Sequence, residues 1–339
     1  MKQPLELIVT MWPEFAHFER TAMDDRVAAI RMNSAIPMGK SPEEFFDEAF
    51  RLAHCTPLYL DIKGRQLRVR EAVPNDDRCE LVVNHPIEVK LPAVTLFKAG
   101  ADCALLTEIK DGTHLIFGEG PKYRINPGES VCIRDPSLKV KGSLPQYEID
   151  LVKKARECGM NKYMLSYVES QQDIDQFKQY TGPDADIVAK IESRKGVRYA
   201  STEFKKAPGL SLLTARGDLF VEVPKPHHII AATRAIAKRD PEAIAASRIL
   251  LSVTNEPEPS CADFSDLAFL LDCGYRRIML CDGLCMKEEA VNTAINIIDQ
   301  FARDYGYELV KKGSPIYTPP VPAMATTRGG VYVPRISAR

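Results

Sequence analysis

Residues 185–219 read ADIVAKIESRKGVRYASTEFKKAPGLSLLTARGDL, and this stretch decides the fold. It contains two short apolar runs, 185–192 and 210–215. Runs of this length, rich in Val, Ile and Leu, predict strands. Each run ends in polar residues, Lys190 and Glu192 in the first and Arg216 to Asp218 after the second. The stretch therefore predicts two successive strands with reactive side chains at their carboxyl ends.

The same kind of run recurs on both sides of this stretch. Six further strands are predicted at 5–11, 27–33, 57–62, 162–168, 242–247 and 275–281. Helical periodicity lies between the strands, at 42–54, 146–158, 171–180, 227–239, 261–272 and 286–305. Alternating strands and helices indicate a parallel sheet, and eight strands indicate closure into a (β/α)8 TIM barrel.

One segment interrupts this alternation. Residues 70–142 contain several short strand-like runs with turns at 110–112 and 126–128, and no helical pattern. We interpret them as a small β-barrel lid domain inserted after strand three, over the mouth of the barrel. The predicted domains are residues 1–69 (first part of the TIM barrel), 70–142 (lid), 143–310 (second part of the barrel) and 311–339 (C-terminal tail, docked or disordered, or else a partner-binding arm).

Charge and composition indicate which kinds of binding partner are not expected. The chain has 45 Lys and Arg against 46 Asp and Glu, so nucleic acid and anionic membranes are not expected as main partners. No apolar run approaches the roughly 20 residues of a membrane span. The nine cysteines are scattered without metal-binding spacing, which is typical of reduced thiols in a cytoplasmic protein.

The predicted strand ends carry the candidate chemistry. Lys190 and Glu192 are two positions apart on one strand, so they face the same way. They form either a buried ion pair or a metal carboxylate beside a cationic ligand contact. Asp218 supplies a second oxygen ligand, and two carboxylates suit Mg²⁺ and Mn²⁺ almost equally. Gly217 would let the backbone approach a carboxylate ligand closely.

Further polar residues end the second and third strands. Arg31 and Asn33 end strand two, and the guanidinium of Arg31 suits bidentate phosphate binding. Asp61 and Lys63 end strand three, and Arg68 follows just before the lid.

These motifs resemble those of the pyruvate kinase family. Ala189-Lys190-Ile191-Glu192-Ser193 is similar to the family segment that carries a catalytic lysine and a metal-binding glutamate. Thr214-Ala215-Arg216-Gly217-Asp218-Leu219 is similar to its second metal and carboxylate-binding motif. Asp61-Ile62-Lys63-Gly64 looks like the third-strand motif, and Arg31-Met32-Asn33 looks like the second-strand phosphate and potassium motif. The motifs occur in the same order as in the family, and the resemblance covers about 300 residues.

The resemblance implies a role for each of these residues. Glu192 and Asp218 would bind Mg²⁺ or Mn²⁺, and Lys190 would steady a phosphoryl group or an enolate oxygen. The other implied roles are phosphate binding for Arg31, carboxylate binding for Gly217 and Asp218, and enolate protonation for Ser247. Substrate binding is also expected of Arg216, Asn33, Asp61, Lys63 and Arg68.

The sequence also departs from the family pattern. Ala35 and Ile62 replace hydroxyl residues of the potassium motif, so an intact K⁺ site is not expected. After strand eight, Cys281 and Gly283 replace a serine and a glutamate, which leaves Asp282 as the nearest acid. We expect the family's C-terminal domain to be missing, and a homo-oligomer stays an open alternative.

Three functions remain compatible with these motifs. The first is metal-dependent phosphoryl transfer between phosphoenolpyruvate, or a related 2-oxo acid enolate, and a nucleotide (ATP or ADP). The second is lyase, aldolase or decarboxylase chemistry on a 2-oxo acid at the same metal-enolate site. The third is a non-catalytic binding protein that retains the fold, since fold alone does not fix function.

Overall fold

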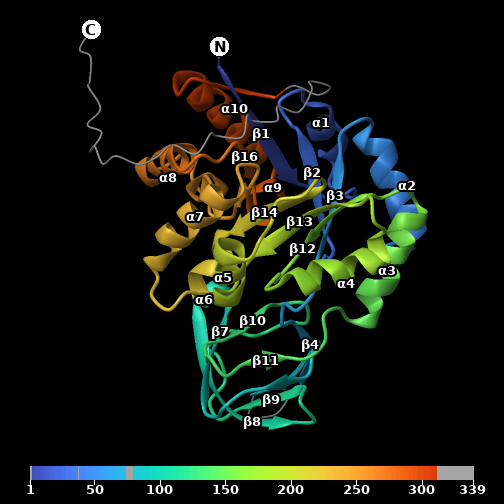
Figure 1. Cartoon of the computed structure of the whole chain (residues 1–339), viewed down its shortest axis with the longest axis vertical. Coiled ribbons are helices and arrows are strands. Elements are labelled where there is room, and N and C mark those ends of the chain that lie inside the picture. The colour runs from blue at the N-terminus through green and yellow to red at the C-terminus, as the bar shows by residue number, and fades with distance from the viewer. Residues whose placement is uncertain (1, 37, 74–78, 311–339) are drawn as a thin grey trace.

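The computed structural model describes residues 2–36, 38–73 and 79–310 of the chain. Within these ranges, eight parallel strands pair in chain order and the last pairs with the first, which closes a barrel (Figure 1). The barrel strands are β1 (Gln3–Thr10), β2 (Ala29–Asn33), β3 (Leu58–Ile62), β12 (Lys162–Leu165), β13 (Asp186–Ile191), β14 (Leu210–Ala215), β15 (Ile244–Ala246) and β16 (Arg277–Met279). The predicted TIM barrel is confirmed, and all eight expected strands differ from their predicted bounds only at the ends.

Helices surround the barrel (Figure 1). They are α1 (Phe18–Met23), α2 (Pro42–Ala53), α3 (Gln146–Glu157), α4 (Gln171–Thr181), α5 (Arg194–Thr202), α6 (Arg216–Glu222), α7 (His228–Arg239), α8 (Cys261–Asp272), α9 (Asp282–Cys285) and α10 (Glu288–Asp304), with the 3₁₀ turn η2 (Leu251–Thr254). Another 3₁₀ turn, η1 (Lys98–Gly100), lies in the segment between β3 and α3. The six predicted helices are present. The sequence did not identify α1, α5, α6 and α9, which are too short to show a clear period of 3.6 residues.

Local sequence signals explain where a helix such as α2 begins. The hydroxyl of Ser41 accepts the N–H of Glu44, and the carboxylate of Glu44 accepts the N–H of Ser41, while Pro42 occupies the first helical position. Phe45 and Phe46 on this helix are fully buried against the barrel. The cap thus fixes the start of a helix whose apolar face covers the sheet.

Strand β13 shows how the barrel separates its two cores. Ile187, Ala189 and Ile191 belong to the apolar layer between strands and helices. Val188 belongs to the core inside the barrel, and Lys190 follows it on the same face. The polar end of β13 therefore lies on the inner face of the barrel, at the carboxyl ends of the strands.

The segment between β3 and α3 forms a separate antiparallel sheet, drawn below the barrel in Figure 1. In the described part of the chain this sheet has six strands in the order β10-β7-β8-β9-β5-β4. They are β4 (Val69–Val73), β5 (Cys79–Val83), β7 (Ala93–Phe97), β8 (Asp102–Lys110), β9 (His114–Phe117) and β10 (Val131–Ile133), with β6 (Ile87–Glu88) and β11 (Lys139–Val140) as a further pair. It has an apolar core of its own, which includes Val83, Phe97 and Phe117.

Both edges of this sheet come together, so the sheet curls into a small barrel. The N–H of Val131 donates to Leu67, and the N–H of Gly128 donates to Val69. The expected turn between β8 and β9 is a type I′ turn, because Asp111 and Gly112 both have positive φ (52° and 72°). The predicted small β-barrel inserted after strand three is confirmed, and we call it the lid.

A parallel strand not predicted from the sequence, β17 (Tyr307–Leu309), pairs with the start of β1. The predicted tail, 311–339, lies outside the described residues, and the predicted domain bounds stay predictions. None of the described helices has both the length and the apolar character needed to cross a membrane.

Candidate active site

A polar cavity of about 200 Å³ lies where the carboxyl ends of the barrel strands meet the lid. Its walls come from β2, the segment after β3, β13, β14, β15 and β16, and Ser130 and Arg68 close it from the lid side. The lining residues are Arg31, Asn33, Lys63, Gln66, Arg68, Ser130, Lys190, Glu192, Leu213, Ala215, Asp218, Ala246, Ser247, Met279, Cys281 and Asp282. Most of the predicted site residues therefore meet in one place.

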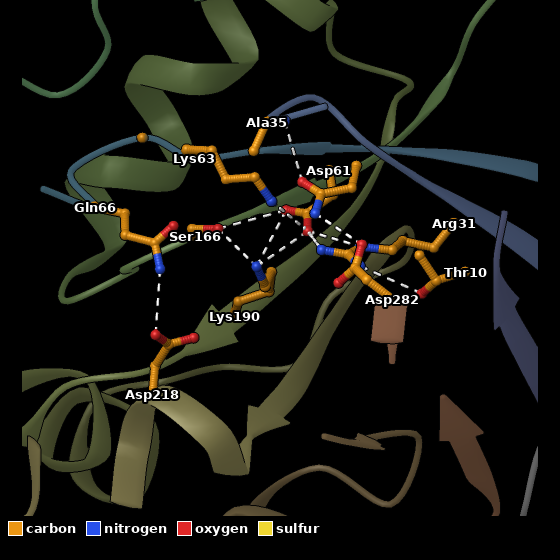
Figure 2. Close-up of polar contacts among 12 residues, drawn as sticks. Thr10, Arg31, Ala35, Asp61, Lys63, Gln66, Ser166, Lys190, Asp218 and Asp282 are labelled. Atoms are coloured by element: carbon orange, nitrogen blue, oxygen red, sulfur yellow. Dashed lines mark hydrogen bonds and ion pairs between the residues drawn. The ribbon is translucent and has the colours of Figure 1, made fainter. Parts of the chain in front are cut away.

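Asp61 lies at the centre of the charged network (Figure 2). Its side chain is fully buried, and its Oδ2 accepts from Arg31 Nε (2.9 Å) and Lys63 Nζ (2.9 Å). The ammonium of Lys190 donates to both carboxylate oxygens, at 3.1 and 3.2 Å. Burial alone would raise the pKa of Asp61, but Lys190, Lys63 and Arg31 outweigh it and hold this pKa well below its usual range. Asp61 is therefore a permanent anion that gathers three side chains of predicted function.

Arg31 has a second carboxylate partner. Its Nη1 donates to Asp282 Oδ2 at 2.8 Å, and Asn33 Nδ2 donates to the other oxygen of Asp282, also at 2.8 Å. Burial would raise the pKa of Asp282, but Arg31 and Lys63 lower it to about 2. Arg31, predicted to bind phosphate, and Asn33, predicted to bind substrate, thus both donate to Asp282.

One carboxylate oxygen of Glu192 accepts a hydrogen bond and the other accepts none. Its Oε2 accepts the backbone N–H of Tyr167 at 2.7 Å. Its Oε1 is buried without a hydrogen-bond partner, although Lys190 Nζ lies 3.2 Å away. Lys190 instead donates to Ser166 Oγ (2.7 Å) and to Asp61. Burial, with Lys190 opposing it, raises the pKa of Glu192.

Asp218 lies across the cavity from the Asp61 network, in the first turn of α6. Gln66 Nε2 donates to its Oδ1 at 3.2 Å, and Gln66 Oε1 accepts from Arg68 at 2.6 and 3.0 Å. These contacts connect the barrel to the base of the lid, and Figure 2 shows the one between Gln66 and Asp218.

The lid also contacts the barrel through the edge strand β10, which lies against the end of α6. Cys132 Sγ on β10 donates to Glu222 Oε1 on α6 at 3.1 Å, and Arg134 Nη2 donates to the carbonyl of Val223 at 3.1 Å. Burial raises the pKa of Glu222 to about 7.

Ser247 and Gly217 lie face to face on the cavity wall. Ser247 has a left-handed backbone (φ 68°), and a Cβ on Gly217 would lie 3.4 Å from that of Ser247. Arg216 is not brought to the cavity. It is buried against α8, with its guanidinium on Asp266 and Nη2 on the carbonyl of Ser247 (2.8 Å), so it supports the cavity wall from behind.

The residues present fit a divalent cation. Glu192 Oε1 is a buried oxygen without a hydrogen bond, and Asp218 contributes a second carboxylate to the same cavity. Two protein carboxylates with substrate and water completing the shell are a common way to bind Mg²⁺. No group of three or more His, Cys, Asp or Glu side chains arranged for a metal occurs in the described ranges.

A larger cavity of about 760 Å³ lies at the opposite end of the barrel. Its lining includes Glu6, Tyr59, Asp186 and Arg277, which lie at or near the amino ends of barrel strands. The charged network at the carboxyl ends does not extend to it. We therefore place the candidate active site in the smaller cavity, at the end of the barrel where TIM-barrel chemistry occurs.

Sequence reasoning did not select Asp282, Ser166 and Gln66. Asp282 and Ser166 each follow the end of a barrel strand, which is the signal that identified the other site residues. Gln66 lies in the loop between β3 and the lid, where no strand alternation points to it.

Comparisons with known proteins agree with this architecture. Residues 136–285 match the family profile "Pyruvate kinase, barrel domain". The pyruvate kinase of Thermoplasma acidophilum is 21% identical over 314 residues, which cover 84% of this chain and 54% of that protein. That of Debaryomyces hansenii is 29% identical over 254 residues (65% and 49%), and that of Agaricus bisporus is 32% identical over 128 residues (36% and 24%). The chain thus spans about half the length, or less, of these curated relatives.

The fold and the site define a lidded (β/α)8-barrel protein with an ionisable cluster at the carboxyl ends of its strands. Together with the matches, they make this chain similar to the barrel part of pyruvate kinases.

Proposed function

We propose that this protein binds a divalent cation through Glu192 and Asp218 and stabilises the enolate of a 2-oxo acid beside Lys190. The observation that carries the proposal is the buried Oε1 of Glu192, which has no hydrogen bond and lies 3.2 Å from Lys190 Nζ. A buried carboxylate oxygen that accepts no hydrogen bond is costly unless a ligand or a cation satisfies it. When bound, Mg²⁺ or Mn²⁺ supplies Lewis-acid polarisation of the carbonyl.

Side chains and backbone groups of the protein would stabilise the enolate, bind the substrate carboxylate and transfer the proton. Lys190 supplies a second positive charge to the enolate oxygen, and its position is fixed by Asp61 and Ser166. The N–H groups of Gly217 and Asp218, in the first turn of α6, are available to the substrate carboxylate. Ser247 presents a hydroxyl at the cavity wall, which suits proton transfer to the enolate carbon.

Phosphoryl transfer to a nucleotide is the second candidate, because the relatives are named pyruvate kinases. In that case Arg31 would contact the transferred group, and ATP or ADP would bind between lid and barrel. Substrate binding by Lys63, Asn33 and Arg68 stays a prediction, and so does the expected lack of an intact K⁺ site.

Proton exchange of pyruvate tests the first proposal directly. Pyruvate in D₂O is followed by proton NMR with the protein and Mg²⁺ or Mn²⁺, with K⁺, and with and without inorganic phosphate. We expect the methyl signal to fall in the wild type and to persist in Lys190→Met and Glu192→Gln. Asp186→Asn, at the amino end of the same strand, is the matched control and should exchange like the wild type.

Metal binding provides a second readout that does not depend on turnover. Glu192→Gln should weaken Mn²⁺ binding by at least about tenfold. Equal Mn²⁺ affinity in the variant and the wild type would rule out this ligand assignment. Metal binding without any exchange would favour a binding protein over an enzyme.

A further inference from the structure

Asp282 takes the position on Arg31 at which a phosphate would bind. It begins α9 directly after β16, and Arg31 and Asn33 each donate to one of its two oxygens at 2.8 Å. The rest of the guanidinium is also engaged, because Nε and Nη2 donate to Asp61 and Nη1 lies 3.3 Å from Thr10 Oγ1. Figure 2 shows Asp282 and Asp61 meeting this one arginine. A phosphate could reach Arg31 only by displacing a carboxylate.

The charges that line the cavity also disfavour a phosphorylated ligand. The basic side chains in its described lining are Arg31, Lys63, Arg68 and Lys190. The acidic ones are Glu192, Asp218 and Asp282, together with Asp61 beneath them, so four positive groups face four negative ones. A divalent cation would add two positive charges, which the dianionic enolate of a 2-oxo acid would neutralise. A phosphorylated acid carries a carboxylate and a phosphate of about 1.5 to 2 negative charges at pH 7, which is about 0.5 to 1 charge more than the enolate, and its phosphate would lie against Asp282.

The volume of the cavity also favours a small ligand. Pockets for drug-sized ligands measure roughly 300–1,000 Å³. This cavity, at about 200 Å³, falls below that range and suits an acid of three or four carbons.

We propose that Asp282 closes the phosphate position on Arg31, so that the site selects a small unphosphorylated 2-oxo acid over its phosphorylated counterpart. This inference rests on the proposed function, since it names the substrate class of the same metal-enolate site. It assigns to Asp282 the role of a specificity-determining residue that acts by repelling anions from Arg31.

Two probes built on two carbons, one without and one with a phosphate, separate the alternatives. Oxalate imitates the planar dianionic enolate, and phosphoglycolate adds a phosphate to a two-carbon acid. Binding of each to the Mn²⁺-loaded protein is measured by calorimetry. We expect the wild type to bind oxalate at least about tenfold more tightly than phosphoglycolate, because like charges in contact at a binding site cost several kcal/mol.

Asp282→Asn tests the residue itself, because it removes the charge and keeps the shape. The variant should bind phosphoglycolate at least about tenfold more tightly than the wild type does, with oxalate affinity changed less than about threefold. Glu6→Gln is the control, since Glu6 pairs with Arg277 at 2.8 Å at the other end of the barrel. It should leave both affinities unchanged.

The outcomes are distinguishable. Equal binding of both probes by the wild type overturns the inference without any variant, and so does an unchanged ratio in Asp282→Asn. Failure of the wild type to bind oxalate with Mn²⁺ overturns the proposed function, and this inference falls with it.

Discussion

Replacing Asp61 with Asn should destabilise the barrel more than any comparable change in the cavity. The carboxylate is fully buried, and its partners Arg31, Lys63 and Lys190 lie within 2.9 to 3.2 Å of it. Asn keeps the shape and removes the charge, so these cations lose a shared counter-ion inside the protein. Its amide nitrogen would also face donors only. Breaking a buried pair in this way costs about 3–5 kcal/mol.

The free energy of unfolding in urea measures this loss, and Trp12 supplies the signal. Trp12 is the sole tryptophan of the chain, and it is buried in the apolar layer between the barrel strands and the helices. With a slope of about 3 kcal/mol per molar urea, the midpoint should fall by about 1–1.5 M. Because the pKa of Asp61 is lowered in the folded state, the difference should persist at neutral pH and shrink only as the pH falls below about 4.

Asp218→Asn is the matched control for Asp61→Asn. Asp218 lies in the same cavity, is partly exposed and accepts one side-chain hydrogen bond at 3.2 Å. Its loss should cost about 1 kcal/mol or less. If Asp61→Asn lowers the free energy of unfolding by no more than about 1 kcal/mol beyond the loss in Asp218→Asn, the network is not organised around Asp61.

Two further perturbations test the elements that hold the site. Burial raises the pKa of Glu148 to about 7, above about 4.3 in the unfolded chain, so its contribution to the free energy of unfolding should decline by at most about 4 kcal/mol between pH 4 and pH 7. Glu148→Gln should flatten this part of the profile, and an equally steep profile in the variant would contradict the assignment. Ser41→Ala removes the cap of α2 and should lower the free energy of unfolding by about 1 kcal/mol. Ser201→Ala, which removes an exposed hydroxyl in the last turn of α5, should change it far less.

The barrel could be predicted because its signals are local. The run at 185–192 became β13 (Asp186–Ile191), since strand length and composition determine its extent. The alternation of Lys190 and Glu192 with Ile191 was sufficient to place both charges on the inner face. The strand β17 was missed because its three residues pair with β1 from the far end of the chain, and nothing local marks them.

The partners of the site residues could not be predicted in the same way. Lys190 and Glu192 were expected either to pair with each other or to serve a metal. The structure shows the ion pair between Lys190 and Glu192 at 3.2 Å, and it adds hydrogen bonds from Lys190 to Asp61, 129 positions earlier in the chain. The contact between Arg31 and Asp282 joins residues 251 positions apart. Such pairings depend on barrel closure between β16 and β1 and on side-chain direction, which no single segment contains.

The attachments of the lid connect these findings to the choice between functions. At its base, Glu148 accepts the N–H groups of Lys63 (2.8 Å) and Gly64 (2.9 Å), so the segment that leads into the lid is held against α3. At its other edge, Cys132 and Arg134 hold the lid to the end of α6.

With both edges attached, the volume of the cavity is set by the lid and the barrel together. A small 2-oxo acid fits this volume without movement of the lid. In the proposed phosphoryl transfer, a nucleotide would need room between lid and barrel, where Ser130 and Arg68 already line the cavity. That reaction would also need Arg31 to be released from Asp282, whereas the proposed enolate chemistry on a small acid would leave this contact in place.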